Sequence, residues 1–426
     1  MTHIEQLIQD MCPNGVEWKT LGEVCDLVTK QTGFDYSNTI KPALLTKKSE
    51  GAIPYMQTRN FTGRRFDYET EYYVPEHIVN QFPRIVLDKQ CLLISIVGSI
   101  GNVGLFPGDE KCFLGGAICV LKFKPGINIS FVYEFMSSIH GQKLLKSKIK
   151  GSGQSTITIE DIRNFSIPFP PQEVQERIVA VLEKYAALAA ELQAELQKRR
   201  TQYEYYRTRL LTPPHADSTA NSTDDCNWVF KPLEEIFELR GGYTPSKNNP
   251  KFWEGGTIPW FRMEDIRANG RVLSDSLLHI TPEAVKGKGL FEKDSFVLAT
   301  SATIGEHAML AVNALTNQRF TNLKIRQQYK EKLDTRFIFH YMFKVDEFCK
   351  AHTNISGFES VDMDALRKMP FPLPPLSEQK RIADLLDEFE KLTTSLTEGI
   401  PAEQAAQQKR YEYFRDLLLT FDRKAE

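Results

Sequence analysis

The stretch Ile167-Pro-Phe-Pro-Pro-Gln-Glu-Val-Gln-Glu-Arg-Ile178 returns 204 positions later as Phe371-Pro-Leu-Pro-Pro-Leu-Ser-Glu-Gln-Lys-Arg-Ile382, and the two copies align without a gap. Each copy has two consecutive prolines, then at least one acidic residue, and ends in an Arg-Ile pair. Proline suits the first turn of a helix, where acidic side chains also interact favourably with the helix dipole. The sequence therefore predicts that a long helix begins at this motif twice in the chain.

The similarity extends well beyond this motif, in the same order in both halves. The further pairs are Leu21-Gly-Glu-Val24 with Leu233-Glu-Glu-Ile236, Ile53-Pro-Tyr55 with Ile258-Pro-Trp260, Ser99-Ile-Gly101 with Thr303-Ile-Gly305, and Tyr203-Glu-Tyr-Tyr-Arg207 with Tyr411-Glu-Tyr-Phe-Arg415. Several ordered matches indicate an internal duplication. The last pair lies 208 positions apart, so the second helical region has four extra residues.

Both helical regions have apolar residues in alternating steps of four and three, which is the pattern of a coiled-coil seam. The seam residues that we predict to form the helix–helix interface are Ile178, Leu182, Tyr185, Leu192 and Leu196, and Ile382, Leu386, Phe389 and Leu396. Each seam needs a partner, and an internal two-fold would pair the two helices antiparallel. Two alternatives are helices packed on their own modules and a parallel homodimeric coiled coil.

The rest of the chain divides into two modules of similar texture, with short β-rich runs between turns that contain glycine and asparagine. We predict a mixed α+β fold with two pseudo-symmetric modules at residues 1–167 and 227–370. Two long antiparallel coiled-coil helices, at 168–211 and 371–421, would join them. Residues 212–226 are polar and rich in proline, serine, threonine and asparagine, which is typical of a linker.

Composition restricts the class of protein. The 426 residues are 41% hydrophobic and 25% charged, as in globular proteins. The chain has no apolar run long enough for a membrane span and no signal-peptide pattern, which predicts a cytoplasmic protein. Its seven cysteines are scattered, so we expect reduced and mostly buried thiols. The net charge of −2 means that any affinity for nucleic acid must come from local patches or from a partner.

Motifs for catalysis are incomplete. Gly98-Ser-Ile-Gly101-Asn-Val-Gly104 lacks the order of a dinucleotide-binding loop. Asn249-Pro-Lys-Phe252 resembles the Asn-Pro-Pro-aromatic loop of adenine methyltransferases, but Lys251 replaces the second proline. The eight histidines are dispersed and do not have zinc-ligand spacing. We therefore predict neither a catalytic site nor a metal site in this chain.

Basic side chains that could neutralise DNA phosphates cluster within both modules. They are Lys47, Lys48, Arg64, Arg65, Lys146, Lys148 and Lys150 in the first module, and Lys247, Arg267, Arg271, Lys286, Lys288 and Arg319 in the second. Reading a base sequence requires arginine, asparagine or glutamine side chains that reach the base edges. The candidates are Gln57, Arg59 and Asn60, with Arg262 at a corresponding place after Trp260.

With these features the sequence resembles the specificity subunits of type I restriction-modification systems along nearly its whole length. The resemblance depends on the duplicated Pro-Pro helix starts and Ile-Pro-aromatic strands, on Cys12-Pro-Asn-Gly-Val-Glu-Trp18 and on Gly242-Tyr-Thr-Pro245. The run Ala189-Ala-Glu-Leu192 is similar to the Ala-Glu-Leu-rich central helices of some members.

The resemblance implies that each module is a target recognition domain that reads one half of a bipartite site in double-stranded DNA. The helices would set the spacer between the half-sites and dock two adenine methyltransferase (M) subunits, which use S-adenosylmethionine. Two restriction and translocase (R) subunits, with ATP and Mg, would complete the restriction complex. This chain itself would have no cofactor and no catalytic activity.

Alternatives from the sequence are a specificity subunit of a type IIB-like or other methyltransferase complex, a single-chain methyltransferase, and a coiled-coil scaffold without a DNA role. A complete cofactor loop would favour the single-chain enzyme. Failure to retain DNA specifically in the presence of the methyltransferase partner would favour the scaffold.

Overall fold

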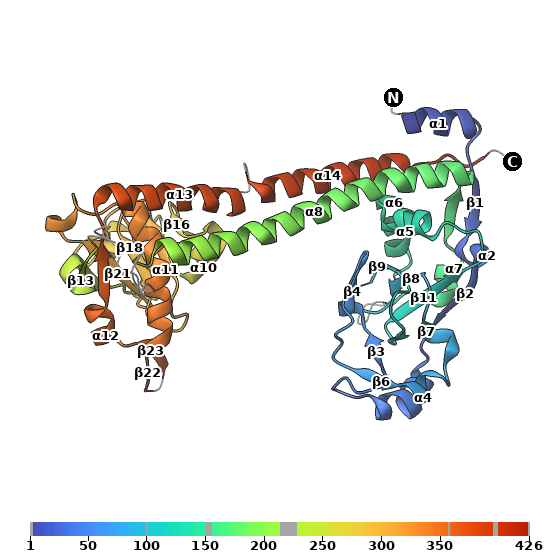
Figure 1. The fold of residues 1–426 in the computed structure, drawn as a ribbon, viewed down its shortest axis with the longest axis horizontal. Coiled ribbons are helices and arrows are strands. Elements are labelled where there is room, and N and C mark those ends of the chain that lie inside the picture. Colours follow the sequence, from blue (N-terminus) through green and yellow to red (C-terminus); the bar gives the residue numbers. More distant parts are fainter. Residues whose placement is uncertain are drawn as a thin grey trace, which may run out of the picture. The chain divides into compact units, whose positions relative to one another are not determined.

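The computed structural model describes residues 3–98, 100–149, 156–213, 228–356, 358–394 and 399–424. The chain forms two compact units (Figure 1). Unit 1 contains Met1–Gln193 and Glu403–Glu426, and unit 2 contains Ala194–Ala402. No helix within the described ranges has the length and the apolar composition that crossing a lipid bilayer requires.

Unit 1 has two four-stranded sheets. One has the strand order β2 (Cys25–Lys30), β11 (Ile118–Phe123), β8 (Cys91–Ser95) and β9 (Val103–Phe106), and the other β6 (Tyr73–Pro75), β3 (Ala52–Met56), β10 (Cys112–Leu114) and β7 (Val86–Leu87). The short hairpin β4 (Phe61–Thr62) and β5 (Arg65–Phe66) follows β3. The α-helices of this unit before residue 172, apart from the short α3, are α1 (His3–Met11), α2 (Leu21–Val24), α4 (Glu76–Val79), α5 (Ile129–Ser137), α6 (Ile139–Ser147) and α7 (Ile159–Arg163).

Unit 2 has a five-stranded and a three-stranded sheet. The first has the order β14 (Phe237–Gly241), β21 (Phe320–Ile325), β18 (Phe296–Ala299), β19 (His307–Leu310) and β16 (Val272–Leu273), and the second β17 (His279–Ile280), β15 (Ile258–Phe261) and β20 (Leu315–Thr316). The hairpin β22 (Thr353–Ser356) and β23 (Phe358–Val361) forms a separate two-stranded sheet, and Val361 N donates to Thr300 O at 2.9 Å. The helices beside these strands are α9 (Leu233–Ile236), α10 (Met263–Asn269), α11 (Thr335–Ala351) and α12 (Met363–Lys368).

The two modules have matching strand topology. The series β2-β11-β8-β9 in unit 1 corresponds to β14-β21-β18-β19 in unit 2, with antiparallel pairing throughout. Likewise β3 pairs in parallel with β10 and antiparallel with β6, as β15 does with β20 and β17. The predicted mixed α+β duplication is therefore confirmed. The modules differ in three places: α5 and α6 correspond to the single helix α11, β16 extends one sheet of unit 2, and β7 extends the other sheet of unit 1.

Each module is closed by a short antiparallel pair of its first and last strands. In unit 1, β1 (Glu17–Thr20) pairs with β12 (Ser166–Phe169), and in unit 2, β13 (Val229–Pro232) pairs with β24 (Pro370–Leu373). The next residue continues the contact, because Leu21 N donates to Phe165 O at 2.8 Å and Leu233 N donates to Met369 O at 2.9 Å. A module therefore begins and ends at the same place, where a long helix starts.

The Pro-Pro motif starts these helices in the same way in both halves. Helix α8 begins at Gln172 and α13 at Leu376, each directly after the second proline. In the first turn, the buried Gln175 side chain donates to Pro170 O at 2.8 Å, and the buried Gln379 donates to Pro374 O at 2.8 Å. The glutamine shared by the two motifs therefore satisfies a carbonyl that the prolines leave without a helical partner.

The two helical regions differ in continuity (Figure 1). Helix α8 (Gln172–Leu210) is a single helix of 39 residues, whereas the second region consists of α13 (Leu376–Thr394) and α14 (Ile400–Leu418), with 19 residues each. Pro401 lies in the first turn of α14, where its missing N–H has no intrahelical acceptor to lose.

The heptad seam lies on the covered side of these helices. Ile178, Leu182, Leu196, Ile382 and Leu386 are buried, and Tyr185, Leu192 and Phe389 are half-buried, whereas Leu396 lies outside the described residues. In unit 1, Tyr185 stacks on Phe414 at 5.3 Å between ring centroids, and Gln404 donates to Gln193 at 3.1 Å. From the first contact to the second, the residue number rises along α8 and falls along α14, so the two helices are antiparallel. In unit 2, the equivalent rings of Tyr206 and Phe389 stack at 5.5 Å.

The ends of the helices also belong to the module cores. Ile178 and Leu182 pack in the same cluster as β2, β8 and α5, and Ile382 and Leu386 pack with β14, β18 and α11. The coiled-coil pairing and the packing of helices on their own modules are therefore both present. The six cysteines in the described ranges have free thiols, five of them buried, and burial raises the pKa of Cys25 to about 12.

Candidate nucleic-acid interface

In unit 1 the loops after three strands meet at one edge of the module, which we call strand-end edge 1 (residues 31–35, 57–60 and 115–117). The buried Gln31 holds them together, because its amide donates to Leu114 O at 3.3 Å and its oxygen accepts from Tyr55 Oη at 3.0 Å. Gly115 N also donates to Met56 O at 2.8 Å. Loops that a rigid sheet positions in this way are common sites of binding residues.

Unit 2 has the equivalent edge, strand-end edge 2 (residues 242–246, 262–265 and 317–319). Tyr243 N donates to Thr316 O at 2.9 Å, and Asn317 N donates to Phe261 O at 3.2 Å. The indole of Trp260 donates to Tyr243 O at 3.0 Å. The backbones of the two edges are thus fastened in the same way, although the side chains that they present differ.

The turn after the Ile-Pro-aromatic strand is capped identically in both modules. Gln57 N donates to Asn60 Oδ1 at 2.9 Å, and Arg262 N, at the corresponding position, donates to Asp265 Oδ2 at 2.7 Å. Asn60 and Asp265 are buried. The Asn60 and Asp265 side chains therefore hold the two turns, and Gln57 and Arg262, the first residues of these turns, are both half-buried.

Of the predicted base-reading side chains, Gln57, Arg59 and Asn60 lie at edge 1 and Arg262 lies at edge 2, where Arg319 is a predicted phosphate contact. At edge 1, the exposed Arg59 donates to Gln57 Oε1 at 2.7 Å and forms an ion pair with Glu71. At edge 2, the buried Nε of Arg262 has no hydrogen-bond partner among the described residues, and its guanidinium lies 3.8 Å from Glu264. The exposed Arg319 follows Asn317, whose side chain accepts from Arg319 N at 3.0 Å. Arginine and glutamine at such an edge have the donors that base edges require.

The predicted phosphate-binding lysines are exposed. Lys286 and Lys288 lie on a glycine-rich turn that Arg240 fastens by donating to Lys288 O at 2.6 Å, and the Lys286 ammonium lies 5.3 Å from the Tyr243 ring. Burial lowers the pKa of Arg240. The other exposed basic residues are Lys47, Lys48, Arg65, Lys146 and Lys148 in unit 1, and Lys247 and Arg267 in unit 2. Lys150 lies outside the described residues.

Arg64 is held against the helices of unit 1. It donates to Glu134 of α5 at 2.9 Å and to Glu183 of α8 at 3.3 Å, and Tyr411 donates to the second oxygen of Glu134 at 2.6 Å. Glu134 is completely buried. Burial alone would lower the pKa of Arg64, but its bonds to Glu134 outweigh this and raise it. Arg64 therefore fastens the β4–β5 hairpin to α5. This hairpin follows the turn at residues 57–60, which, with its counterpart at residues 262–265 in unit 2, we call the reading turn.

Arg271 occupies the same place in unit 2. It donates to His307 O at 2.8 Å and lies 3.5 Å from Asp346 of α11 and 4.9 Å from the Phe343 ring, as Arg64 lies 5.1 Å from the Tyr133 ring. Burial lowers the pKa of His307, although Asp346 acts in the opposite direction. Motifs and spacing in the sequence do not predict the acidic partners of these two arginines. The available signal was a single acidic residue within an apolar helix, as in Phe131-Val-Tyr-Glu134-Phe-Met136.

One cluster has donor atoms of the kind that bind metals. The ligand atoms of His340, Asp387 and Glu390 lie within 4.8 Å of one another. However, Arg336 forms ion pairs with both carboxylates. Burial would raise the pKa of Asp387, but hydrogen bonds from His340 and Arg336 outweigh it and lower the value to about 2. These ion pairs fasten α11 to α13. The Arg336 guanidinium already supplies the positive charge that a metal ion would bring to the two carboxylates.

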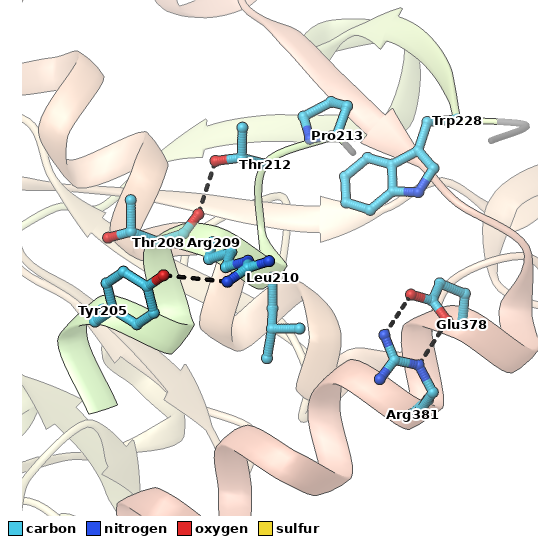
Figure 2. Close-up of a pocket in the computed structure, with 9 residues that line it drawn as sticks. All are labelled: Tyr205, Thr208, Arg209, Leu210, Thr212, Pro213, Trp228, Glu378 and Arg381. Carbon is cyan, nitrogen blue, oxygen red and sulfur yellow. Dashed lines mark hydrogen bonds and ion pairs between the residues drawn. The ribbon is translucent and has the colours of Figure 1, made fainter. Parts of the chain in front are cut away.

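A second surface repeats on the helices. Tyr205 and Tyr413 occupy matching positions, are 56% and 64% exposed, and contact the next aromatic ring edge-on. Leu188 and Leu392, 204 positions apart, are 36% and 37% exposed. Figure 2 shows the hollow beside Tyr205, a cavity of 630 Å³ between the end of α8, Trp228 and the first turn of α13.

The sequence matches the Type I restriction modification DNA specificity domain twice, over residues 13–199 and 226–404. The chain belongs to this family. The two matches begin near the two closing strands, and each includes one module and most of the helical region after it.

Several curated members of the specificity family are similar to this chain. The specificity subunit of the Escherichia coli EcoprrI enzyme is 47% identical over 204 residues, which are 46% of this chain and 50% of that subunit. The Escherichia coli EcoR124I/EcoR124II subunit is 37% identical over 61% of this chain and 65% of its own length. The chain thus spans about half to two thirds of these two relatives. A putative specificity subunit from Haemophilus influenzae is 28% identical over 99% of this chain and 98% of its own length.

The fold of the specificity family is also found in a solved structure. A chain from a study of complex assembly and conformational transition of the type I R-M system is 18% identical, with a TM-score of 0.62. The alignment covers 96% of this chain and 98% of that chain. At this identity the similarity shows a shared fold.

We expect Arg64→Ala to lower the free energy of unfolding of unit 1 by about 3 kcal/mol, because it leaves the buried Glu134 carboxylate without its cation. Arg64→Ala combined with Glu134→Gln should cost less than Arg64→Ala alone. The measurement is urea unfolding followed by ¹⁹F NMR of 5-fluorotryptophan, since Trp18 is the only tryptophan of unit 1. The exposed neighbour Arg65→Ala is the control, with a change below about 0.5 kcal/mol. A similarly small effect of Arg64→Ala would contradict the fastening role.

Proposed function

We propose that this chain is the DNA-specificity subunit of a type I restriction-modification enzyme, and that each module reads one half of a bipartite target. The observation that carries the proposal is the pair of strand-end edges. Their backbones are fastened alike, but edge 1 presents Gln57 and Arg59 whereas edge 2 presents Arg262 and Arg319. Equal scaffolds with different polar side chains suit two different half-sites.

In this proposal residues 1–167 and 227–370 are the target recognition domains. The helical regions 168–211 and 371–421 act as the spacer that holds the half-sites at a fixed separation, and residues 212–226 link the halves. A stiff paired helix suits this role because half-sites on one face of DNA need a constant distance. The exposed lysines and arginines of the modules contact phosphates.

The repeated helix surface supports two copies of one partner. Leu188 with Tyr413 in unit 1, and Leu392 with Tyr205 in unit 2, present the same two residue types. Exposed tyrosines are frequent anchors of protein interfaces. We assign these surfaces to two identical adenine methyltransferase subunits, and the complete complex includes two restriction and translocase subunits.

In this complex the chain is a non-catalytic subunit in the cytoplasm. S-adenosylmethionine is bound by the methyltransferase subunits, and ATP with Mg by the translocase subunits. The incomplete catalytic motifs support this division, because Asn249-Pro-Lys-Phe252 lacks the second proline of a methyltransferase loop. Here Pro250 lies instead in a short 3₁₀ turn.

The proposal is tested by methylome sequencing of a host that expresses this chain with its methyltransferase partner. We expect N6-methyladenine in a bipartite motif with a fixed gap, because two modules read two half-sites. A host with the methyltransferase alone is the control. Methylation of one continuous short motif, or no methylation, would count against the function.

Removing one heptad between Ala186 and Arg200 tests the spacer. Seven helical residues correspond to about 10 Å, or about three base pairs. The gap in the methylated motif should shorten, or modification should stop, while the bases of each half-site stay the same. Substitutions of exposed residues in that segment, such as Lys198→Ala, should leave the gap unchanged. Altered bases with an unchanged gap would contradict the spacer role.

The partner surfaces are tested by Tyr205→Ala and Tyr413→Ala. Each should weaken the binding of one methyltransferase subunit about 30-fold, because central interface tyrosines contribute about 2 kcal/mol. Native mass spectrometry should show complexes with one methyltransferase for either variant, and the double variant should bind neither copy. Val229→Ala, at another exposed apolar residue, is the control. Two methyltransferase subunits on both single variants would contradict the assignment.

A further inference from the structure

Phe34 is 77% exposed, the highest fraction among the large apolar side chains in the described part of the chain. It lies in a tightly bonded turn, because Asp35 N donates to Thr32 Oγ1 at 3.1 Å and Tyr36 N donates to Thr32 O at 3.1 Å. The π-helix η1 (Tyr36–Ile40) follows, and its Ile40 is completely buried. A phenyl ring is therefore presented to solvent by a fastened backbone.

This ring belongs to strand-end edge 1. It comes three residues after Gln31, the buried side chain that joins the loops of this edge through Tyr55 and Leu114. The reading turn that carries Gln57 follows directly from β3, the strand of Tyr55. Phe34 is thus an apolar group on the same edge as the predicted base-reading residues.

Unit 2 has an apolar group beside its own reading turn. Leu277 is 58% exposed, and its N–H donates to Asp265 Oδ1 at 2.6 Å. The other oxygen of this buried carboxylate caps the turn of Arg262. The Asp265 carboxylate therefore accepts hydrogen bonds from the backbone N–H groups of both Leu277 and Arg262, the predicted base-reading arginine.

These two side chains differ from the apolar residues on the helices. Tyr205 and Tyr413 match in type and position, as expected for two identical partners. Phe34 and Leu277 have neither the same type nor matching positions, and they lie in the divergent parts of the modules. Residues that differ between the modules suit a ligand that differs between the two halves. In the proposed function the DNA half-sites differ in this way, whereas the protein partner is the same for both halves.

We propose that Phe34 and Leu277 are apolar wedges that contact the base stack of their half-sites, an inference that rests on the proposed DNA-recognition function. Phenylalanine and leucine are among the residues that DNA-binding proteins insert between base steps. The cost of opening a step depends on its sequence, so a wedge contributes specificity without a hydrogen bond to a base. Each module then reads its half-site by polar contacts and by the deformability of one step.

The test uses the purified complex with its methyltransferase and a duplex containing the motif found by methylome sequencing. Phe34→Ala should weaken DNA binding about tenfold, in line with the loss of one stacking contact, and Phe34→Trp should retain the affinity. The salt dependence should not change, because no charge is removed, whereas Lys286→Ala, at an exposed residue predicted to contact phosphate, should reduce the slope by about one. Leu277→Ala should act in the same way as Phe34→Ala, and Val229→Ala is the matched exposed control.

The position of each wedge is read by permanganate oxidation of unstacked thymines. Phe34→Ala should remove the reactive step in one half-site only, and Leu277→Ala should remove the step in the other. Unchanged affinity and unchanged reactivity in both variants would overturn the proposal, as would a loss of methyltransferase binding with normal DNA contacts. In either case the wild-type complex still methylates a bipartite motif, whereas failure of the proposed function removes that methylation.

Discussion

The antiparallel pairing of the first and last strand of each module is the constraint on which the rest of the structure depends. Through β1 with β12, and β13 with β24, the chain enters and leaves a module at one point. The Pro-Pro motif directly after the closing strand then starts a helix, with Gln175 or Gln379 satisfying the carbonyl of the first proline. A domain closed in this way can be duplicated or diverge internally without displacing its helix.

The helices extend this order beyond the modules. In each unit the seam is buried between a helix and its antiparallel partner, with one aromatic stack in an equivalent place, Tyr185 on Phe414 and Tyr206 on Phe389. Stacked rings add to the area that they bury, because their edges and faces complement each other. The outer sides repeat the exposed Tyr205 and Tyr413, so the pattern that packs the helices together leaves matching tyrosines available for the proposed partner.

The strand-end edges separate support from recognition. Buried polar groups such as Gln31, Asn60 and Asp265 hold the loops, because unsatisfied buried groups are costly and their bonds are specific in direction. Arg64 and Arg271 extend this support to α5 and α11 through acidic partners. The exposed side chains between these supports differ in the two modules, as the proposed recognition of two different half-sites requires.

The sequence by itself determined the duplication, the helix starts, the seam and the family, because these depend on local periodicity and on motifs of contiguous residues. It also located Gln57 and Arg262 at equivalent positions, through the neighbouring Ile-Pro-aromatic strands. Only the tertiary structure decided which basic residues are exposed and which, like Arg64 and Arg271, meet buried acids far along the chain. It also placed Phe34 in the loop that follows Gln31 at edge 1, and it bonded Leu277 to the Asp265 carboxylate that caps the Arg262 turn. The physical reason is that ion pairs and exposure depend on which distant segments the sheets and helices bring together, and composition or spacing along one segment does not record this.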